Sequence, residues 1–599
     1  MTGHAGHDAS GDAQGLRRRA FIGAGLAGAG MALVGTARTA RAQAPAATGA
    51  MGQMPHPAYP HLPAIPLDPD GLGDTLAKLE IREAQTLQAK QSLTHRYTIG
   101  GQTRDGYAFL YGAEPPRPLE HPDQFAIGWT TMPDVASAGA ARLPRWSRAL
   151  TDPDAATREF WPTIARYGIA VNIVGPQRVT GAAIGELRRA FGSAWTRSVQ
   201  AAAAAGRLYA FDMRRFAALA PQTTPDGVRF TPATVTLLRR HPRSGDLRPV
   251  AVLVSGPEGA GRQVYTRERA TDGAWLYALQ AAKTSITVFG IWLGHVYQWH
   301  LVTAAMLMAM HDALPAGHPI AQLLAPQSKY LVAFDQALMA QWSAIAPPTS
   351  LTTADQFLAL CDAFADGRRF FDDDPGQTLR AMGLRERDFS DHAPWDRFPV
   401  ARKMLAVYAL VERYVRTCVH ASYPSDAAVA GDQALQAWMA AASAPDGGNI
   451  AGLPALTGRD ALTRVCTSIL HRITIHGASR LNSTPNPALS FVGNFPHCLQ
   501  RTDIPGPRTE IDTPTLLSYL PNTKTIAQAL DFYFIFAFST PYEPAIPLGG
   551  PGADLFFDGG PDSPRNRALI DLRKGLAAFI RQEQPDMPQL YQWPRNIET

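Results

Sequence analysis

The sequence predicts a mainly α-helical chain with a small β-sheet portion. From residue 275 onward, apolar residues recur at the spacing of long helices. Residues 205–270 instead alternate apolar and polar residues between turn signals, which is typical of short strands. The chain has 599 residues, of which 46% are hydrophobic and 18% are charged, so it can bury a large core.

The N-terminus is predicted to be a targeting signal. The Arg18-Arg19 pair fits the twin-arginine pattern, and the Gly/Ala-rich stretch 21–35 after it is too short and too weakly apolar to span a bilayer. Ala40-Arg-Ala supplies a small-x-small cleavage pattern, which predicts a mature start at Gln43. We assign residues 1–42 to a twin-arginine signal peptide and expect a periplasmic or secreted protein exported by the twin-arginine machinery.

The next segment is predicted to be a linker followed by a helix. Residues 43 to about 70 are rich in Pro, Ala and Gly, and Gly71–Tyr97 carries a helical pattern without a proline break. We therefore assign 43–100 to a Pro/Ala-rich linker and N-terminal helix. Residues 101–599 are expected to form one large domain, because no low-complexity linker divides them.

Within that domain the strand-like region comes first. The turn Gly256-x-x-Gly259-x-Gly261 lacks the following Lys-Ser/Thr of a phosphate loop, so we interpret it as a hairpin loop. The helical periodicity then predicts these long helices: Ala281–Ala313, Ser328–Ala346, Pro399–Ala421, Asp432–Ala442, Asp460–Arg480, Thr525–Phe538 and Ser563–Gln584.

The most informative motif is His295-x4-His300 in an apolar run, with His318-Pro-Ile-x-x-Leu-Leu-x-Pro eighteen residues later. On an α-helix, side chains five residues apart diverge by roughly 140°. In a π-helical turn they point the same way, and such turns are frequent at functional sites. Two converging neutral imidazoles indicate a metal. The alternative is an ordinary pair of core histidines.

These residues, with the intervals between them, resemble the metal helix and following turn of the lipoxygenases. The resemblance runs from about residue 160 to the C-terminus. It includes Gly245-Asp-Leu-Arg-Pro-Val-Ala-Val-Leu, Trp275 with Ala282-Lys283, Tyr423-Pro-Ser-Asp426, Asp432-Gln-Ala-Leu435-Gln436-Ala-Trp438, and Leu462-x-x-Val-Cys-Thr before His476. It implies a large helical catalytic domain of the lipoxygenase type over 101–599, without the lipid-docking β-sandwich that plant and animal members carry.

The resemblance also implies a metal site. His295, His300 and His476 match three histidine ligands of one non-haem iron per chain, with iron expected in preference to manganese. The family places Asn, His or Ser four residues after the third histidine, but this chain has Arg480, a permanent cation. Asn482 is our candidate for the fourth ligand, and His471, Ser479 and water remain open.

The last family ligand is the carboxylate of a C-terminal isoleucine. Here the chain stops at Glu598-Thr599, so Thr599 is our candidate. The Glu598 side chain, or a tail that misses the metal, remains open. The family's hydrogen-bonding Gln four residues before the first histidine is Ile291 here, which bears on the redox tuning of the site.

The implied function is oxygenation of a polyunsaturated fatty acid at a cis,cis-1,4-pentadiene to a lipid hydroperoxide, with hydrogen abstraction by Fe(III)-OH. The alternatives are altered chemistry on the same fold, such as hydroperoxide isomerisation or oxidation of another apolar substrate, and a catalytically silent lipid-binding protein. The partners are the fatty acid and O2.

The net charge and the cysteine spacing limit which partners and which cysteine chemistry we expect. The formal net charge is +5, and the Lys and Arg residues are scattered, so we expect no nucleic-acid partner. A mildly basic surface suits fatty-acid carboxylates or an anionic membrane surface. The four cysteines form no C-x-x-C pair, so we expect buried free thiols.

Overall fold

We describe the protein from a computed structural model. The residues that it describes are 96–99, 102–105, 150–167, 175–224, 227–242, 245–315, 317–324, 354–365, 367–384, 398–444, 448–483, 496–520 and 557–583. The predicted signal peptide 1–42, the linker, and the predicted helices Ser328–Ala346 and Thr525–Phe538 lie outside them. So does most of the predicted helix Gly71–Tyr97, but its last two residues belong to strand β1 (Arg96–Ile99), where that prediction was wrong.

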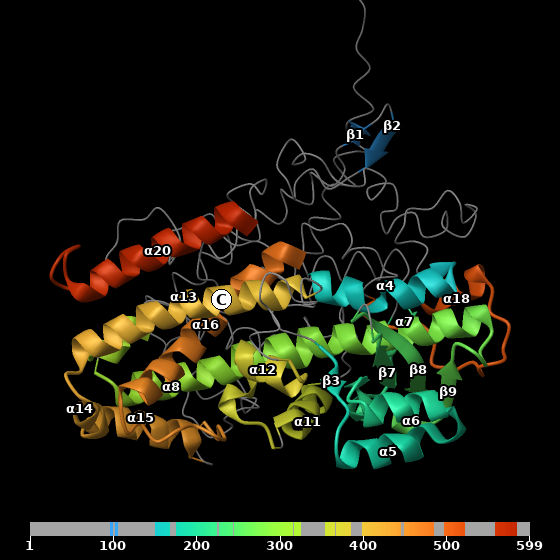
Figure 1. Ribbon diagram of the computed structural model, residues 1–599, viewed down its shortest axis with the longest axis horizontal. Coiled ribbons are helices and arrows are strands. Elements are labelled where there is room, and N and C mark those ends of the chain that lie inside the picture. The colour runs from blue at the N-terminus through green and yellow to red at the C-terminus, as the bar shows by residue number, and fades with distance from the viewer. Residues whose placement is uncertain are drawn as a thin grey trace, which may run out of the picture.

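A continuous helical run crosses the middle of the molecule and organises the fold (Figure 1). It consists of α7 (Asp272–Val288), the π-helix η10 (Phe289–Leu301) and α8 (Val302–Ala313). Every residue from Gly273 to Val288 is buried. A helix that is buried on all sides has neighbours on all sides, and here they are α4 (Pro153–Tyr167), strands of the sheet, and later helices.

The run begins earlier than the sequence pattern predicted. The Thr271 hydroxyl accepts a hydrogen bond from the backbone N–H of Ala274, so Thr271 is the N-cap and the helix starts at Asp272 rather than near Ala281. Thr-Asp before an apolar run is the usual signal of a helix start, and the predicted bounds overlooked it.

One five-stranded antiparallel sheet forms the β portion, in the order β3-β4-β7-β8-β9. Its strands are Gln177–Arg178, Leu208–Asp212, Ala233–Arg240, Leu247–Ser255 and Gln263–Thr266. On β8, Val252 and Val254 face the main core, whereas Ala251 and Leu253 face a second cluster under α5 (Ala182–Phe191) and α6 (Arg197–Ala204). This period of two places the sheet between α5/α6 and the central run.

The expected hairpin loop is confirmed. The turn between β8 and β9 contains the short helix η9 (Pro257–Gly259), and the two strands pair antiparallel. Gly259 and Gly261 have φ angles of +78° and +61°, which side chains other than glycine rarely adopt.

Long helices cover the other sides of the central run. Helix α13 (Pro399–Ser422) packs against α16 (Arg459–Ser483) and α20 (Pro564–Glu583), and α15 (Gln433–Ser443) packs against α8. These bounds lie within three residues of the predicted ones. The remaining elements are β2 (Gln102–Asp105), η7 (Gly192–Ala194), η8 (Arg214–Ala218), β5 (Gln222–Thr224), β6 (Gly227–Arg229), α11 (Ala354–Ala365), η12 (Phe370–Asp373), α12 (Pro375–Ala381), α14 (Asp426–Ala430) and α18 (Thr513–Tyr519).

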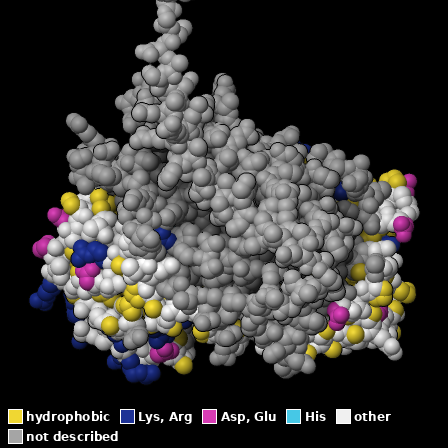
Figure 2. All heavy atoms as spheres, turned by 180° about the vertical axis from the view of Figure 1, so that it is seen from behind, with side chains coloured by type: hydrophobic (Ala, Val, Ile, Leu, Met, Phe, Trp, Pro, Cys, Tyr) yellow, Lys and Arg dark blue, Asp and Glu magenta, His cyan; other side chains and the backbone are white. Residues whose placement is uncertain are grey.

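The structure confirms that all four cysteines are free and buried. Within the described residues, no helix combines the length and apolar composition needed to cross a bilayer. Figure 2 shows basic, acidic and apolar side chains mixed at the end of the molecule formed by the sheet, α5 and α6. The exposed residues there include Arg188, Arg189 and Arg197.

Candidate metal centre

The π-helix that the histidine spacing predicted is present. It spans Phe289–Leu301, and the backbone N–H of Val302 at its end bonds to the carbonyl of Tyr297, five residues back. Trp292 and Leu293 are fully buried, so the distorted segment lies inside the core rather than at a frayed end. Because a π-turn returns after about five residues, the backbone positions of His295 and His300 lie one above the other.

His295 is buried, with 6% of its surface exposed. The side chain of His300 lies outside the described part, as do those of His476, Ser479 and Asn482. The backbone positions of the last three are nevertheless known: all lie on α16, which packs against the π-helix. Thr599 and Glu598 lie beyond the described residues.

This arrangement fits a metal held by imidazoles. The π-helix carries two of the predicted histidines one turn apart, and the helix that carries the third packs beside it. Of the three, only His295 has a described side chain, and the described side chains contain no group of three or more His, Cys, Asp or Glu residues placed to hold a metal. The complete ligand set therefore stays a prediction.

His471, an alternative fourth ligand, is a buried neutral histidine. Burial lowers its pKa to about 3, against the raising effect of its bond to the Met404 carbonyl. The Nε2–H donates that bond over 3.2 Å, which leaves Nδ1 as the nitrogen with a lone pair. The ring packs against Tyr408 and Trp299, with centroid distances of 5.0 and 6.1 Å. Any metal bond from His471 would have to come from Nδ1.

A buried ionic cluster fixes the helix that carries His476. Arg472, four residues before His476, is 2% exposed and lies 3.8 Å from Asp373. It donates to the Phe370 carbonyl and stacks on the Phe370 ring at 4.2 Å. Burial raises the pKa of Asp373, against the lowering effect of Arg368 and Arg472. Because breaking a buried ion pair is costly, this cluster fixes the rotation of α16 about its axis.

Beside it, burial raises the pKa of Asp374 to about 6, although Arg472 and a hydrogen bond from Ser468 of α16 both oppose the shift. Tyr408 of α13 also donates to this carboxyl, over 3.4 Å. Asp374 therefore joins α12, α13 and α16 at one point.

Residues of the motif Tyr423…Asp432…Trp438 hold α8, the C-terminal end of the central helical run. The Asp432 carboxylate accepts hydrogen bonds from His318 Nε2 (3.0 Å) and the Tyr423 hydroxyl (2.8 Å). The Trp438 indole N–H donates to the carbonyl of Met306 on α8 over 2.9 Å. The motif Tyr423…Asp432…Trp438 is thus structural: it fastens α15 to the helix that continues the π-helix.

The motif Trp275 with Ala282-Lys283 lies on α7, the N-terminal end of the central helical run. The Trp275 indole N–H donates to the Thr157 hydroxyl on α4 over 2.8 Å. Lys283 is buried two turns before the π-helix, and burial lowers its pKa to about 7, against the raising effect of Glu159. The run Thr303–Met310 after the π-helix is buried in the main core and does not line the cavity described next.

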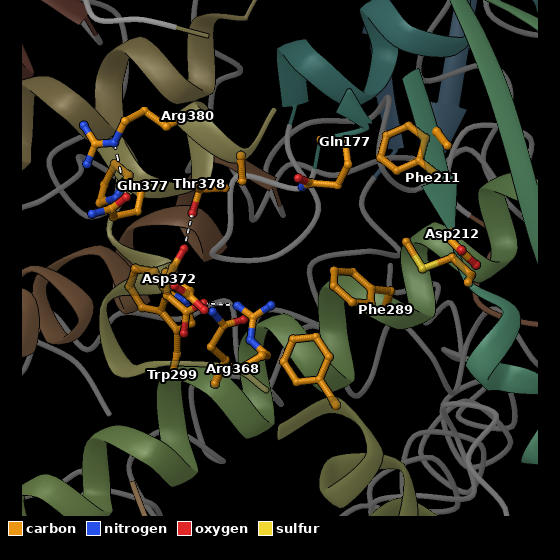
Figure 3. A pocket seen from close by; sticks show the side chains of 18 of the residues that line it. Gln177, Phe211, Asp212, Phe289, Trp299, Arg368, Asp372, Gln377, Thr378 and Arg380 are labelled. Atoms are coloured by element: carbon orange, nitrogen blue, oxygen red, sulfur yellow. Dashed lines mark hydrogen bonds and ion pairs between the residues drawn. The ribbon is translucent and has the colours of Figure 1, made fainter. Parts of the chain in front are cut away.

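A cavity of about 920 Å³ adjoins the π-helix and α16 (Figure 3). Phe289, Gln298 and Trp299 of the π-helix and His471 of α16 form part of its wall. The remaining wall comes from Gly175, Gln177, β4, Met213, η8, the end of α11 with Arg368, η12, α12 and Met404. Sequence reasoning missed this cavity because these segments are far apart in the chain.

The comparisons with known proteins decide the family. A family model described as Lipoxygenase matches residues 195–523, more than half of the chain, and this range contains η10 and α16. The chain belongs to the lipoxygenase family. The expected family and mainly α fold are thereby confirmed.

The relatives of this lipoxygenase-family chain come from bacteria, plants and animals. It is 26% identical over 355 residues to a linoleate 9/13-lipoxygenase of Pseudomonas aeruginosa, which covers 56% of this chain and 50% of that protein. It is 26% identical over 312 residues to a chloroplastic lipoxygenase 1 of Tanacetum cinerariifolium, covering 48% of this chain and 32% of that one. The chain thus spans half or less of the length of these relatives.

Solved lipoxygenase structures share the fold over more of the chain. A calcium-dependent 11R-lipoxygenase superposes with a TM-score of 0.61 and 16% identity, covering 86% of this chain and 72% of that one. A fungal lipoxygenase from Fusarium graminearum gives 0.60 and 16%, covering 88% and 87%. At this identity the likeness concerns the fold.

Proposed function

We propose that this lipoxygenase-family protein is a non-haem iron dioxygenase. It inserts O2 into polyunsaturated fatty acids that contain a cis,cis-1,4-pentadiene and forms lipid hydroperoxides. The observation that carries the proposal is the buried π-helix Phe289–Leu301, which bears His295 and His300 inside the segment that matches the family. The names of the relatives, among them a linoleate 9/13-lipoxygenase, support this substrate class.

In this proposal His295, His300 and His476 hold the iron, Asn482 is the fourth ligand, and the Thr599 carboxylate is the fifth. Bound iron supplies the one-electron chemistry that removes a hydrogen atom from the bis-allylic carbon. The set combines neutral imidazoles with one carboxylate, a mixture that suits iron cycling between two oxidation states.

The chain's own part is to position the ligands and to exclude water. Trp292 and Leu293, which precede His295 in the sequence, are completely buried, so this part of the π-helix is closed to bulk water. Excluding water from the site limits side reactions of reactive intermediates. The ionic cluster around Arg472 holds α16 against η12, and the indole of Trp438 holds α15 against α8, the helix that continues the π-helix.

Oxygen consumption with linoleate tests the function. The full-length protein, purified with its iron, is expected to take up O2 and to produce a conjugated-diene absorbance in equal amounts. Stearate, which has no pentadiene, is expected to give neither. Iron-loaded protein that consumes no O2 with linoleate but turns over a preformed hydroperoxide would contradict the proposal in favour of hydroperoxide isomerisation.

We also propose export by the twin-arginine pathway to the periplasm or beyond. The Arg18-Arg19 pair, the weakly apolar stretch after it and the Ala40-Arg-Ala pattern support this route. Because this pathway carries folded proteins, the iron can be inserted before export. Changing Arg18 and Arg19 to Lys is expected to retain the protein in the cytoplasm, which cell fractionation would detect. Unchanged export would refute the route.

A further inference from the structure

Exposed arginines gather where helix α5 ends and helix α6 begins (Figure 2). They come from the end of α5, the start of α6, the end of strand β7 and the residue before β9. In the sequence they look scattered, and the fold brings them to one side of the sheet. We call this surface the arginine face, and it consists of Arg188, Arg189, Arg197, Arg239 and Arg262.

Hydrogen bonds hold the two arginines of the sheet against the two helices. The guanidinium of Arg239 donates to the hydroxyl of Ser198 in the first turn of α6. The guanidinium of Arg262 donates to the carbonyl of Ala190 in the last turn of α5. Since the short helix η7 joins these two turns, the five arginines surround one helix junction.

Few acidic side chains offset this positive charge. Helices α5 and α6 and the turn between them contain one acidic residue, Glu186, and it is bound to Arg214. Acidic residues return only at the border of the arginine face, with the exposed Glu268 and with Asp272, which pairs with Arg267. Holding like charges together costs electrostatic free energy, which an anionic surface opposite them lowers.

The rest of the outer surface of α5, η7 and α6 is made of small or polar residues, such as Ala183, Ser193 and Gln200. The large apolar side chains of these helices, among them Phe191 and Trp195, are buried against the sheet. The face therefore lacks an exposed aromatic anchor, which is common at the centre of protein interfaces. It also lacks the apolar side chains that an interfacial helix inserts between lipids. Charge is what this rigid surface offers to a partner.

We propose that the arginine face adsorbs to the surface of a bilayer that contains anionic phospholipids. A guanidinium presents a planar fork of donors that matches a phosphate group. Each basic residue close to an anionic bilayer strengthens binding about fivefold. The choice of a bilayer over other polyanions rests on the proposed function, whose substrates are lipid acyl chains, whereas the anionic character of the partner follows from the arginines alone.

Co-sedimentation of the full-length protein with phospholipid vesicles tests the surface. The vesicles carry monounsaturated acyl chains, which contain no pentadiene, so binding is measured without oxygenation. The wild type is expected to bind vesicles of phosphatidylglycerol and not those of phosphatidylcholine, whose head group has no net charge. High salt is expected to release it, because the Debye length falls to about 3 Å at 1 M and exposed charges are then screened.

A triple variant of the helix junction combines Arg188→Gln, Arg189→Gln and Arg197→Gln. It is expected to bind phosphatidylglycerol vesicles roughly a hundredfold more weakly, because about fivefold is lost with each arginine. These side chains are exposed, so the fold should persist, which circular dichroism checks. Lysine at the same three positions keeps the charge and is expected to keep the binding.

The matched control removes the same charge from exposed positions on α13 and α20, with Arg413→Gln, Arg567→Gln and Arg581→Gln. It is expected to bind vesicles as the wild type does. Equal weakening in both triple variants would show that only the net charge matters and would overturn the proposal. So would a wild type that binds no phosphatidylglycerol, that binds phosphatidylcholine equally well, or that prefers duplex DNA. If linoleate supports no O2 uptake while the junction variant still loses vesicle binding, the proposed function fails and the arginine face stands.

Discussion

Asp432 is predicted to contribute strongly to stability, because it joins α15 to His318 and Tyr423. Its Oδ1 accepts the backbone N–H groups of Ala434 and Leu435 and caps α15, whereas its Oδ2 accepts from His318 Nε2 and the Tyr423 hydroxyl. The backbone N–H of Ile320 donates to His318 Nδ1 over 3.2 Å. That contact fixes the neutral tautomer of His318 with its proton on Nε2, pointing at Asp432.

Asp432→Asn keeps the shape and the cap but puts an amide NH₂ where Oδ2 was. Two donors, the introduced side-chain amide and His318 Nε2–H, then face each other. If His318 changes tautomer, its Nδ1 no longer accepts from Ile320. One bond is lost in either case, and a hydrogen bond to a charged group contributes about 1.5–3 kcal/mol. We expect a loss of about that size in the free energy of unfolding.

Thermal unfolding followed by circular dichroism measures this loss. The midpoint is expected to fall by roughly 1–3 °C, whereas Asp571→Asn, the same change at an exposed position on α20, should leave it unchanged. Burial opposes the charge of Asp432, but the hydrogen bonds from His318 and Tyr423 outweigh it and lower the pKa below 3.8. The ionised group therefore stabilises the fold above that pH. The difference between wild type and Asp432→Asn should be full at pH 5 and shrink as the pH falls below about 3.8. A pH-independent difference, or none, would refute this role.

Two further predictions concern buried positions. Because the pKa of Asp374 is raised from 3.8 to about 6, its ionisation destabilises the fold, so stability should fall by ~3 kcal/mol as the pH rises from about 4 to about 6. Thermal midpoints of Asp374→Asn should change less over that window, and an equal fall in both proteins would contradict the assignment. Gly273→Ala should destabilise α7 although alanine favours helices by ~1 kcal/mol, because an added Cβ would lie 1.8 Å from the Ile511 carbonyl oxygen. Overpacking costs about 1–3 kcal/mol or more, and a raised thermal midpoint would show that this contact relaxes freely.

The π-helix was predictable because two histidines five residues apart face the same side of a helix only on a π-helical turn. The strands and the long helices were predictable because their apolar residues recur every second residue or at helical spacing. The predicted start of α7 was wrong because its N-cap, Thr271, lies ten residues before the position at which the predicted helix begins. The role of Tyr423 and Asp432 as a link to His318 could not be read from the sequence, since more than a hundred residues separate the partners.

The arginine-lined cavity lay beyond sequence reasoning for the same reason. Arg215 follows β4, Arg368 follows α11, and Trp299 lies on the π-helix, and only the folded chain brings them to one wall. Asn482 and Thr599 stay predictions, because neither side chain lies in the described part. Local patterns thus predicted the elements, whereas long-range packing determined the cavity.

Metal content tests the central claim most directly. The full-length protein, purified without added metal, is expected to contain close to one iron per chain by elemental analysis. His300→Ala is expected to lose it, whereas His420→Ala, at an exposed position on α13, should retain it. Iron that persists in His300→Ala would contradict the assignment of the π-helix as the metal-binding element. A wild type without iron, even after reconstitution, would leave a lipid-binding protein with the lipoxygenase fold.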